Sequence, residues 1–336
     1  MGTSKKNRIF YYDNLKFFLI LTVVIGHFAD EMSPMPGSFK SLFLWIYSFH
    51  MPLFLFIGGM FHKNDNVLPK VVRFVMIGFV LNIGLFLEKL AFGWEPSLSY
   101  FRMTGVPWYM FVLAGYTVLS YLLRKMDKKA ILIFAIILGL FSGYDSSLGD
   151  TLALSRFIVF YPFFVLGNMV KPDQPIKVLE QKWIRIVGIM VIAAWAIMCI
   201  TRIDSIYMLR TLFTGRNSFG EKYGTWAFFY RGLAYIITLV AGFGVMCLIP
   251  KGKLPVATSL GERSIQIYFW HYFIIFLLNY MGVEKMLATG TFNHLVWLIL
   301  AVLCTLVTGM KLFSFPTDQI INLSRYAKDQ TRRDIF

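Results

Sequence analysis

Cysteine is scarce in this sequence, with three residues in a chain of 336: Cys199, Cys247 and Cys304. All three lie within apolar runs, where cysteine acts as a small packing residue. At these spacings they form neither a disulfide framework nor the paired ligands of a zinc site. The sequence therefore predicts no metal site, and the cysteines do not indicate a compartment.

Charge is also sparse and unequal in sign. Charged residues make up 15% of the chain, and 33 basic against 18 acidic residues give a formal net charge of +15. The basic residues are spread over many short connections and form no single basic arm or face, which argues against a nucleic-acid-binding protein. Short basic connections are instead typical of the cytoplasmic loops of membrane proteins.

Apolar residues dominate the rest of the composition. Hydrophobic residues account for 57% of the chain, and the mean hydropathy is +0.63. The apolar runs repeatedly reach the length that spans a bilayer, and no repeat, low-complexity tract or soluble domain interrupts them. The expected fold is an all-α, polytopic membrane helical bundle that forms one domain over residues 1–336.

About ten transmembrane spans are expected from the lengths of the apolar runs and the breaks between them. The first run is long, carries Lys16 and lacks a small-residue cleavage site, so it is expected to remain as a helix and not to be removed as a signal peptide. The fifth and sixth spans are short and are expected to be tilted, broken or partly re-entrant. The spans are placed at residues 9–29, 39–61, 71–92, 107–124, 129–144, 156–170, 184–203, 226–249, 264–282 and 293–313.

The basic residues indicate the orientation of these spans. They gather in alternate connections, which places a short N-terminus (residues 1–8) and a hydrophilic tail (residues 317–336) in the cytoplasm. The seventh loop, from Arg202 to Lys222, is an exception because it also carries Arg210 and Arg216 and is expected to be external. It is either a counter-ion patch for an acidic ligand or a sign that the number of spans is wrong.

The first span contains two ionisable residues, Lys16 and His27, eleven positions apart. At about 100° per residue they lie on one face of a helix, about 16 Å apart along its axis. Ionisable residues within a membrane normally face a bundle interior or a cavity. This helix is therefore expected to form one wall of a reaction chamber, although Lys16 can also extend to the headgroups and His27 can also be a packed, hydrogen-bonded histidine.

Other polar and aromatic residues in the spans can likewise belong either to a functional site or to helix packing and the membrane surface. His50 precedes Pro52, and this segment either lines a cavity or only kinks the helix. Glu88, Trp108, Tyr109 and Arg156 are candidates for a site, but each also fits a position at the membrane surface. Tyr268 and His271 are the candidates in the ninth span.

Taken in order, five segments resemble the acyltransferase-3 family of integral membrane acyltransferases over essentially the whole chain. The family's arginine and histidine in the first span correspond to Lys16 and His27, so the charge is retained but the planar guanidinium is lost. Trp108 with Tyr109, and Arg156, are further positions similar to the family. The segments are YYDNLKFFLILTVVIGHF, HMPLFLFIGGMF, PWYMFVLAGY, RFIVFYPFFVLGNMV and SIQIYFWHYF.

The resemblance implies transfer of an acyl group, usually acetyl, from cytoplasmic acyl-CoA to a hydroxyl of a cell-surface polysaccharide or lipid-linked glycan. The enzyme would be a stand-alone O-acetyltransferase in the cell (plasma or inner) membrane, in contact with its lipids. A polytopic transporter or exporter of a small solute or glycan precursor is the alternative, and a non-catalytic subunit of a polysaccharide assembly complex is another. The acceptor glycan and the oligomeric state are left open.

Roles for the candidate residues follow from the implied reaction. His27 either takes a proton from the acceptor hydroxyl or carries the acyl group as a transient intermediate. Lys16 and Arg73, with Lys63, are expected to hold the anionic CoA, while Arg156 holds the acceptor or stabilises an oxyanion. Glu88 or Asp30 is expected to orient the imidazole. The remaining expected substrate contacts are His50, Trp108, Tyr109, Tyr268 and His271.

Overall fold

The computed structural model describes residues 9–96, 105–149 and 151–323. The expected N-terminal segment 1–8 and the end of the expected tail, residues 324–336, lie outside the described residues. Over the described ranges the chain is helical and contains no β-strand. The expected all-α fold is confirmed.

Eleven long helices build the described part of the bundle, and shorter α- and 3-10 helices connect them. The long ones are α1 (Phe10–Glu31), α2 (Gly37–Tyr47), α3 (His50–Met60), α4 (Val67–Ala91), α5 (Trp108–Leu122), α6 (Lys128–Phe141), α7 (Leu154–Met169), α9 (Lys182–Thr201), α12 (Ala227–Leu248), α14 (Ser264–Tyr280) and α16 (Thr291–Thr308). The connecting ones are η1 (Ser142–Tyr144), α8 (Asp173–Val178), α10 (Ile203–Ile206), η2 (Tyr207–Leu209), α11 (Arg210–Thr214), η3 (Glu221–Trp226), α13 (Pro255–Glu262), α15 (Val283–Met286) and η4 (Lys311–Ser314).

Each of the ten expected spans coincides with one long helix or with the α2–α3 pair. Among the described residues, six helical segments are long and apolar enough to cross a membrane: α1, Gly37–Met60, α4, α9, Tyr223–Leu248 and α16. α5 and α7 are shorter apolar helices. The membrane-helix class is thus supported, while the ten crossings and the cytoplasmic termini stay predictions.

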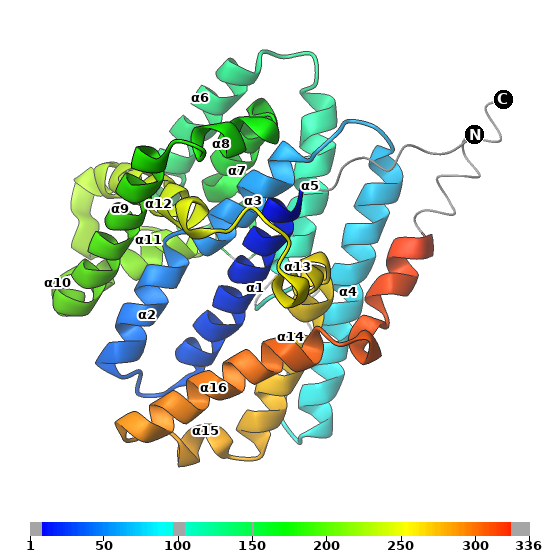
Figure 1. The fold of residues 1–336 in the computed structure, drawn as a ribbon, viewed down its shortest axis with the longest axis vertical. Coiled ribbons are helices and arrows are strands. Elements are labelled where there is room, and N and C mark those ends of the chain that lie inside the picture. The colour runs from blue at the N-terminus through cyan, green and yellow to red at the C-terminus, as the bar shows by residue number, and fades with distance from the viewer. Residues whose placement is uncertain (1–8, 97–104, 150, 324–336) are drawn as a thin grey trace.

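Helix α1 occupies the middle of the bundle, and α2, α3, α13, α14 and α16 pack against it (Figure 1). In the apolar 18-residue stretch of α1, 67% of the residues are buried inside the protein. In the corresponding stretches of α4 and α9 the buried share is 22%. A helix that is apolar on all sides, and that other parts of the protein leave mostly uncovered, is suited to face lipid. The chain therefore surrounds its first span with protein and presents α4 and α9 outward.

The break between α2 and α3 follows from Pro52. Proline has no backbone N–H to donate to the carbonyl of the residue four positions earlier, which is Ser48. The helix is interrupted at Phe49, whose φ of −135° is not helical, and it resumes at His50. The expected kink is confirmed, and it places Tyr47 and His50 at the wall of a cavity.

Helices α3 and α7 approach each other closely through two glycines. A Cβ atom built on Gly59 would overlap the carbonyl oxygen of Phe164, and one built on Gly167 would overlap the carbonyl oxygen of Phe56. Asn168 adds a hydrogen bond from its Nδ2 atom to the Gly59 carbonyl oxygen, at 3.2 Å. Small residues that let two backbones touch are a common means of packing helices in membranes.

Substituting Gly59 by alanine is expected to destabilise the folded protein by about 1–3 kcal/mol, the usual cost of overpacking a well-packed contact. Gly58→Ala is the matched control, because a Cβ there meets no atom closer than 3.7 Å and alanine is the better helix former. The measurement is the thermal unfolding midpoint of each purified variant in detergent. Equal midpoints for the two variants would show that the α3–α7 contact is not tight.

Candidate functional site

Two cavities, each of about 270 Å³, lie toward opposite ends of α1. One, here the Lys16 cavity, is lined by Lys16 in the first half of α1, together with Arg73 at the start of α4. The other, the His27 cavity, is lined by His27 near the carboxyl end of α1 and by His50 at the start of α3. Met51 lines both cavities, so its side chain lies between them.

The Lys16 cavity combines cations with apolar walls. The Nζ atom of Lys16 forms an ion pair with Asp13 Oδ1 at 2.8 Å, and Arg73 lies over the ring of Phe74 at 4.9 Å. Burial lowers the pKa of His62, which lies in the connection after α3, so this residue favours the neutral form. The apolar part of the lining includes Ile20, Val23, Phe54, Ile57, Leu113, Phe164 and Ile265.

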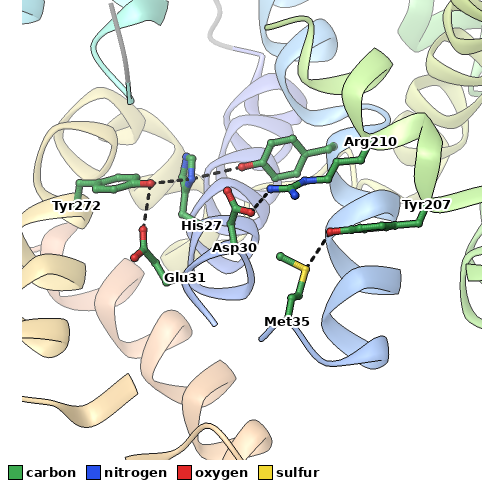
Figure 2. A network of polar contacts seen from close by, with 8 residues as sticks. His27, Asp30, Glu31, Met35, Tyr207, Arg210 and Tyr272 are labelled. Atoms are coloured by element: carbon green, nitrogen blue, oxygen red, sulfur yellow. Dashed lines mark hydrogen bonds and ion pairs between the residues drawn. The ribbon is translucent and has the colours of Figure 1, made fainter. Parts of the chain in front are cut away.

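His27 lies half-buried between two tyrosines (Figure 2). Its Nδ1 atom is 3.4 Å from the hydroxyl of Tyr47 and 3.5 Å from the hydroxyl of Tyr272. The Tyr272 hydroxyl also lies 3.5 Å from Oε1 of Glu31, and Oε2 of Glu31 accepts a hydrogen bond of 2.8 Å from Asn279. The contacts Glu31–Tyr272–His27 therefore link a carboxylate to the imidazole through the hydroxyl of one tyrosine.

The donor-to-acceptor direction of these hydrogen bonds favours one tautomer of His27. An ionised carboxylate can only accept, so Tyr272 donates a hydrogen bond to Glu31 and keeps its oxygen lone pairs for His27. In the tautomer of His27 that completes this series of contacts, Nδ1 donates to Tyr272 and Nε2 carries no proton; the Tyr47 hydroxyl lies 3.4 Å from the same Nδ1. An unprotonated Nε2 on a residue that lines a cavity is a base available to a bound ligand.

The two other histidines near His27 are oriented by backbone carbonyls. The Nδ1 atom of His50 lies 2.9 Å from the carbonyl oxygen of Ile46, and that of His271 lies 3.1 Å from the carbonyl oxygen of Ile267. Because a carbonyl only accepts, both Nδ1 atoms carry protons and both Nε2 atoms are bases. His50 lines the His27 cavity, whereas His271 is fully buried and stacks on the His27 ring at 5.4 Å.

His271, an expected substrate contact, is fully buried and lines neither of the two cavities, so its contact with a substrate stays a prediction. Glu88 is likewise not among the residues that line either cavity. Asp30, the other expected partner of the imidazole, instead accepts from Arg210 at 2.5 Å. Glu31, four residues after His27 and so on the same helix face, is the carboxylate that lies beside Tyr272, while the roles expected for Glu88 and Asp30 stay predictions.

Three aromatic residues contribute to the walls of the two cavities. Trp108 lines the His27 cavity, while its neighbour Tyr109 and the nearby Tyr268 line the Lys16 cavity. The rings of Trp108 and Tyr109 are 5.8 Å apart, and those of Tyr109 and Tyr268 are 5.7 Å apart. Tyr268 donates its hydroxyl proton to the carbonyl of Val106, which ties α14 to the residues before α5. These three expected site residues are thus brought together with Met51.

Three arginines line the His27 cavity: Arg156, Arg210 and Arg216. The guanidinium of Arg156 lies over the ring of Trp108 at 4.8 Å, and that of Arg210 lies over the ring of Phe43 at 4.7 Å. The seventh loop therefore brings its two unexpected cations to the candidate site. Tyr47, Tyr272 and Glu31 were not predicted as site residues, although the last two adjoin predicted positions in the sequence.

Comparison with known proteins identifies a family for this chain. The model of the acyltransferase-3 family, described as an acyltransferase domain, matches residues 9–311, a range that includes both cavities and every candidate residue. No curated protein and no solved structure matches the chain. A match over most of the chain establishes the family. The chain belongs to the acyltransferase-3 family and is a membrane acyltransferase.

Proposed function

We propose that this protein transfers an acyl group, in the first instance acetyl, from acyl-CoA to a hydroxyl of a cell-surface or lipid-linked glycan. The observation that carries the proposal is that two cavities along α1 share the Met51 side chain in their linings. One has cations and long apolar walls, and the other has an oriented imidazole base. This is the arrangement that a donor and an acceptor require if they enter from opposite sides of a membrane.

The Lys16 cavity suits the donor. CoA carries phosphates at one end and a slender arm that ends in the thioester, so cations at Lys16 and Arg73 can bind the anionic end. The apolar wall from Ile20 to Met51 can then receive the arm and the acyl group. A lysine at the position of the family's arginine supplies a point charge, which binds phosphate without a bidentate fork. Lys63 does not line this cavity.

The chemistry in the His27 cavity starts from the unprotonated Nε2 of His27. This atom takes the proton of the acceptor hydroxyl, and the hydroxyl oxygen attacks the thioester carbonyl. The C–S bond then breaks, and the proton on His27 passes to the departing CoA thiolate, which leaves an ester and free CoA. Tyr272 and Glu31 stabilise the imidazolium that forms between these two steps, as a carboxylate does in a catalytic triad.

Arg156 provides a positive charge in the same cavity for the oxyanion that forms on the thioester carbonyl. A second route begins with attack of Nε2 itself on the thioester, which places the acyl group on His27 before the sugar hydroxyl accepts it. The two routes differ in a single turnover without acceptor, because only the second releases CoA and retains label on the protein.

The orientation of the reaction follows from the basic connections. With both termini in the cytoplasm, the Lys16 end of α1 faces the cytoplasm and the His27 end faces outward. The donor then stays on the side where acyl-CoA is made, and the acceptor is a glycan at the outer face of the cell membrane. The acyl group crosses at Met51 while CoA remains on its own side.

Purified protein with labelled acetyl-CoA and a glycan acceptor tests the proposal. An acyltransferase moves label to the acceptor, whereas a transporter or a scaffold leaves the acetyl-CoA intact. Lys16→Ala is expected to raise the KM for acetyl-CoA by about tenfold, the effect of losing one charge-assisted contact at a partly exposed site. Lys177→Ala, an exposed lysine that lines neither cavity, is the control. An unchanged KM in Lys16→Ala would remove this residue from the donor site.

A further inference from the structure

The hydroxyl of Tyr47 lies beside the proposed base but has no role in the steps described above. Tyr47 is the last residue of α2 and lines the His27 cavity. Its hydroxyl oxygen lies 3.4 Å from Nδ1 of His27, and the hydroxyl of Tyr272 lies 3.5 Å from the same nitrogen. Two tyrosine hydroxyls therefore share one ring nitrogen, which has either one proton or one lone pair to offer them.

The contacts of Tyr272 determine what remains for Tyr47. Tyr272 donates to the carboxylate of Glu31, so its oxygen presents lone pairs to His27. An Nδ1 atom without a proton would set its own lone pair against those of Tyr272, whereas a protonated Nδ1 binds them. A protonated Nδ1 cannot accept from Tyr47, and no other residue in the described part of the chain accepts a hydrogen bond from this hydroxyl. The O–H group of Tyr47 is therefore a donor that a ligand in the cavity can use.

The ring that carries this hydroxyl is fixed by its neighbours. It stacks on Phe43 with 3.6 Å between the ring centroids, and it packs edge-on against His50 at 4.6 Å. On the side of α1 it approaches Gly26, where a Cβ atom would lie 3.2 Å from Cε2 of Tyr47. The donor is thus held in place before any substrate binds, which is what stabilisation of a developing charge requires.

The His27 cavity also contains Arg156, the cation assigned above to the oxyanion. Attack on the thioester moves a negative charge onto one oxygen, and oxyanion holes commonly meet this charge with two donors from different parts of the chain. Arg156 belongs to α7, whereas Tyr47 precedes the break between α2 and α3 and is four positions before Met51. Tyr47 therefore supplies a second donor next to the residue that lies between the two cavities.

We propose that Tyr47 is a further catalytic residue, whose hydroxyl donates a hydrogen bond to the oxyanion of the thioester carbonyl. As the acceptor oxygen bonds to the carbonyl carbon, one electron pair of the C=O bond moves onto the carbonyl oxygen, which Tyr47 and Arg156 stabilise. When this pair re-forms the double bond, the C–S bond breaks and the thiolate leaves. Tyr47 keeps its proton in both steps. This assignment rests on the proposed acyl transfer.

Tyr47→Phe removes the hydroxyl and keeps the ring contacts. We expect kcat for acetyl transfer to fall by about 100-fold, as for loss of one oxyanion donor. The KM values for acetyl-CoA and for the glycan should change little, because the hydrogen bond strengthens only in the transition state. Tyr207→Phe is the matched control, since its hydroxyl bonds to Met35 and it lines neither of the two cavities. The measurement is steady-state label transfer by full-length protein, per amount of folded protein.

The pH dependence of kcat separates a donor to the oxyanion from a residue that acts through His27. Tyr272→Phe breaks the link between His27 and Glu31, so it is expected to change the shape of the profile. Tyr47→Phe is expected to lower the whole profile and to keep its shape. An unchanged kcat in Tyr47→Phe, a loss confined to KM, or the change of shape seen in Tyr272→Phe would overturn the proposal. Failure of the proposed function would appear separately, as no label transfer by the unaltered protein.

Discussion

Replacement of His27 by alanine is expected to lower the rate of acyl transfer by about 10³-fold, within the range for loss of a general base. The reason is that the proposed base is this residue, whose Nδ1 lies 3.5 Å from the hydroxyl of Tyr272, which in turn lies 3.5 Å from Oε1 of Glu31. The protein should still fold and insert, because His27 is half-buried at a cavity and its removal leaves α1 otherwise packed. The measurement is label transfer by purified variant with equal amounts of folded protein.

His50→Ala is the most informative comparison for this prediction. His50 lines the same cavity and also has an unprotonated Nε2 atom, so it is the one other oriented imidazole in the described cavity lining. His294→Ala is a control for histidine loss, since His294 hydrogen bonds to the carbonyl of Ala288 and lines neither cavity. Activity that survives in His27→Ala and disappears in His50→Ala would reassign the base to His50.

Met51→Trp is expected to reduce transfer by about 100-fold while acetyl-CoA still binds. Met51 is the residue that lines both cavities, and an indole there would keep the thioester away from the acceptor hydroxyl. Misplacement of reacting groups by about 1 Å can cost a factor of this size. The two measurements are the Kd for acetyl-CoA and the rate of transfer.

Met51→Leu is the matched control, because leucine is close to methionine in volume and leaves the space between the cavities nearly unchanged. Transfer at the normal rate in Met51→Trp would show that the acyl group does not pass this residue. Loss of acetyl-CoA binding in the same variant would place Met51 in the donor site alone. Either result contradicts the proposed path between the cavities.

The local features of this site could be predicted from the sequence because they depend on helix geometry. The eleven-residue spacing of Lys16 and His27 places both on one face, and the structure puts each at a cavity. The break before His50 follows from the missing N–H of Pro52, which is also a local effect. Such inferences require only the amino-acid sequence within a few helical turns of the residue.

The partners of His27 could not be predicted in the same way. Tyr272 is 245 positions away and reaches the imidazole because α14 packs against α1, which no local pattern specifies. Arg210 is separated from Asp30 by 180 positions in the same manner. Glu88 was expected near the imidazole because it is an acidic residue in a span, but a charge alone does not indicate which helix lies opposite. The carboxylate that contacts Tyr272 is Glu31, at the end of the helix that carries the histidine.

Transfer across a sealed membrane tests the central claim most directly. Labelled acetyl-CoA is placed outside proteoliposomes that contain the protein, and an acceptor glycan is trapped inside. If the donor and acceptor cavities open on opposite sides, label appears on the trapped glycan while CoA stays outside, and Met51→Trp prevents this. Label that reaches a glycan only when it shares a compartment with acetyl-CoA would contradict the claim.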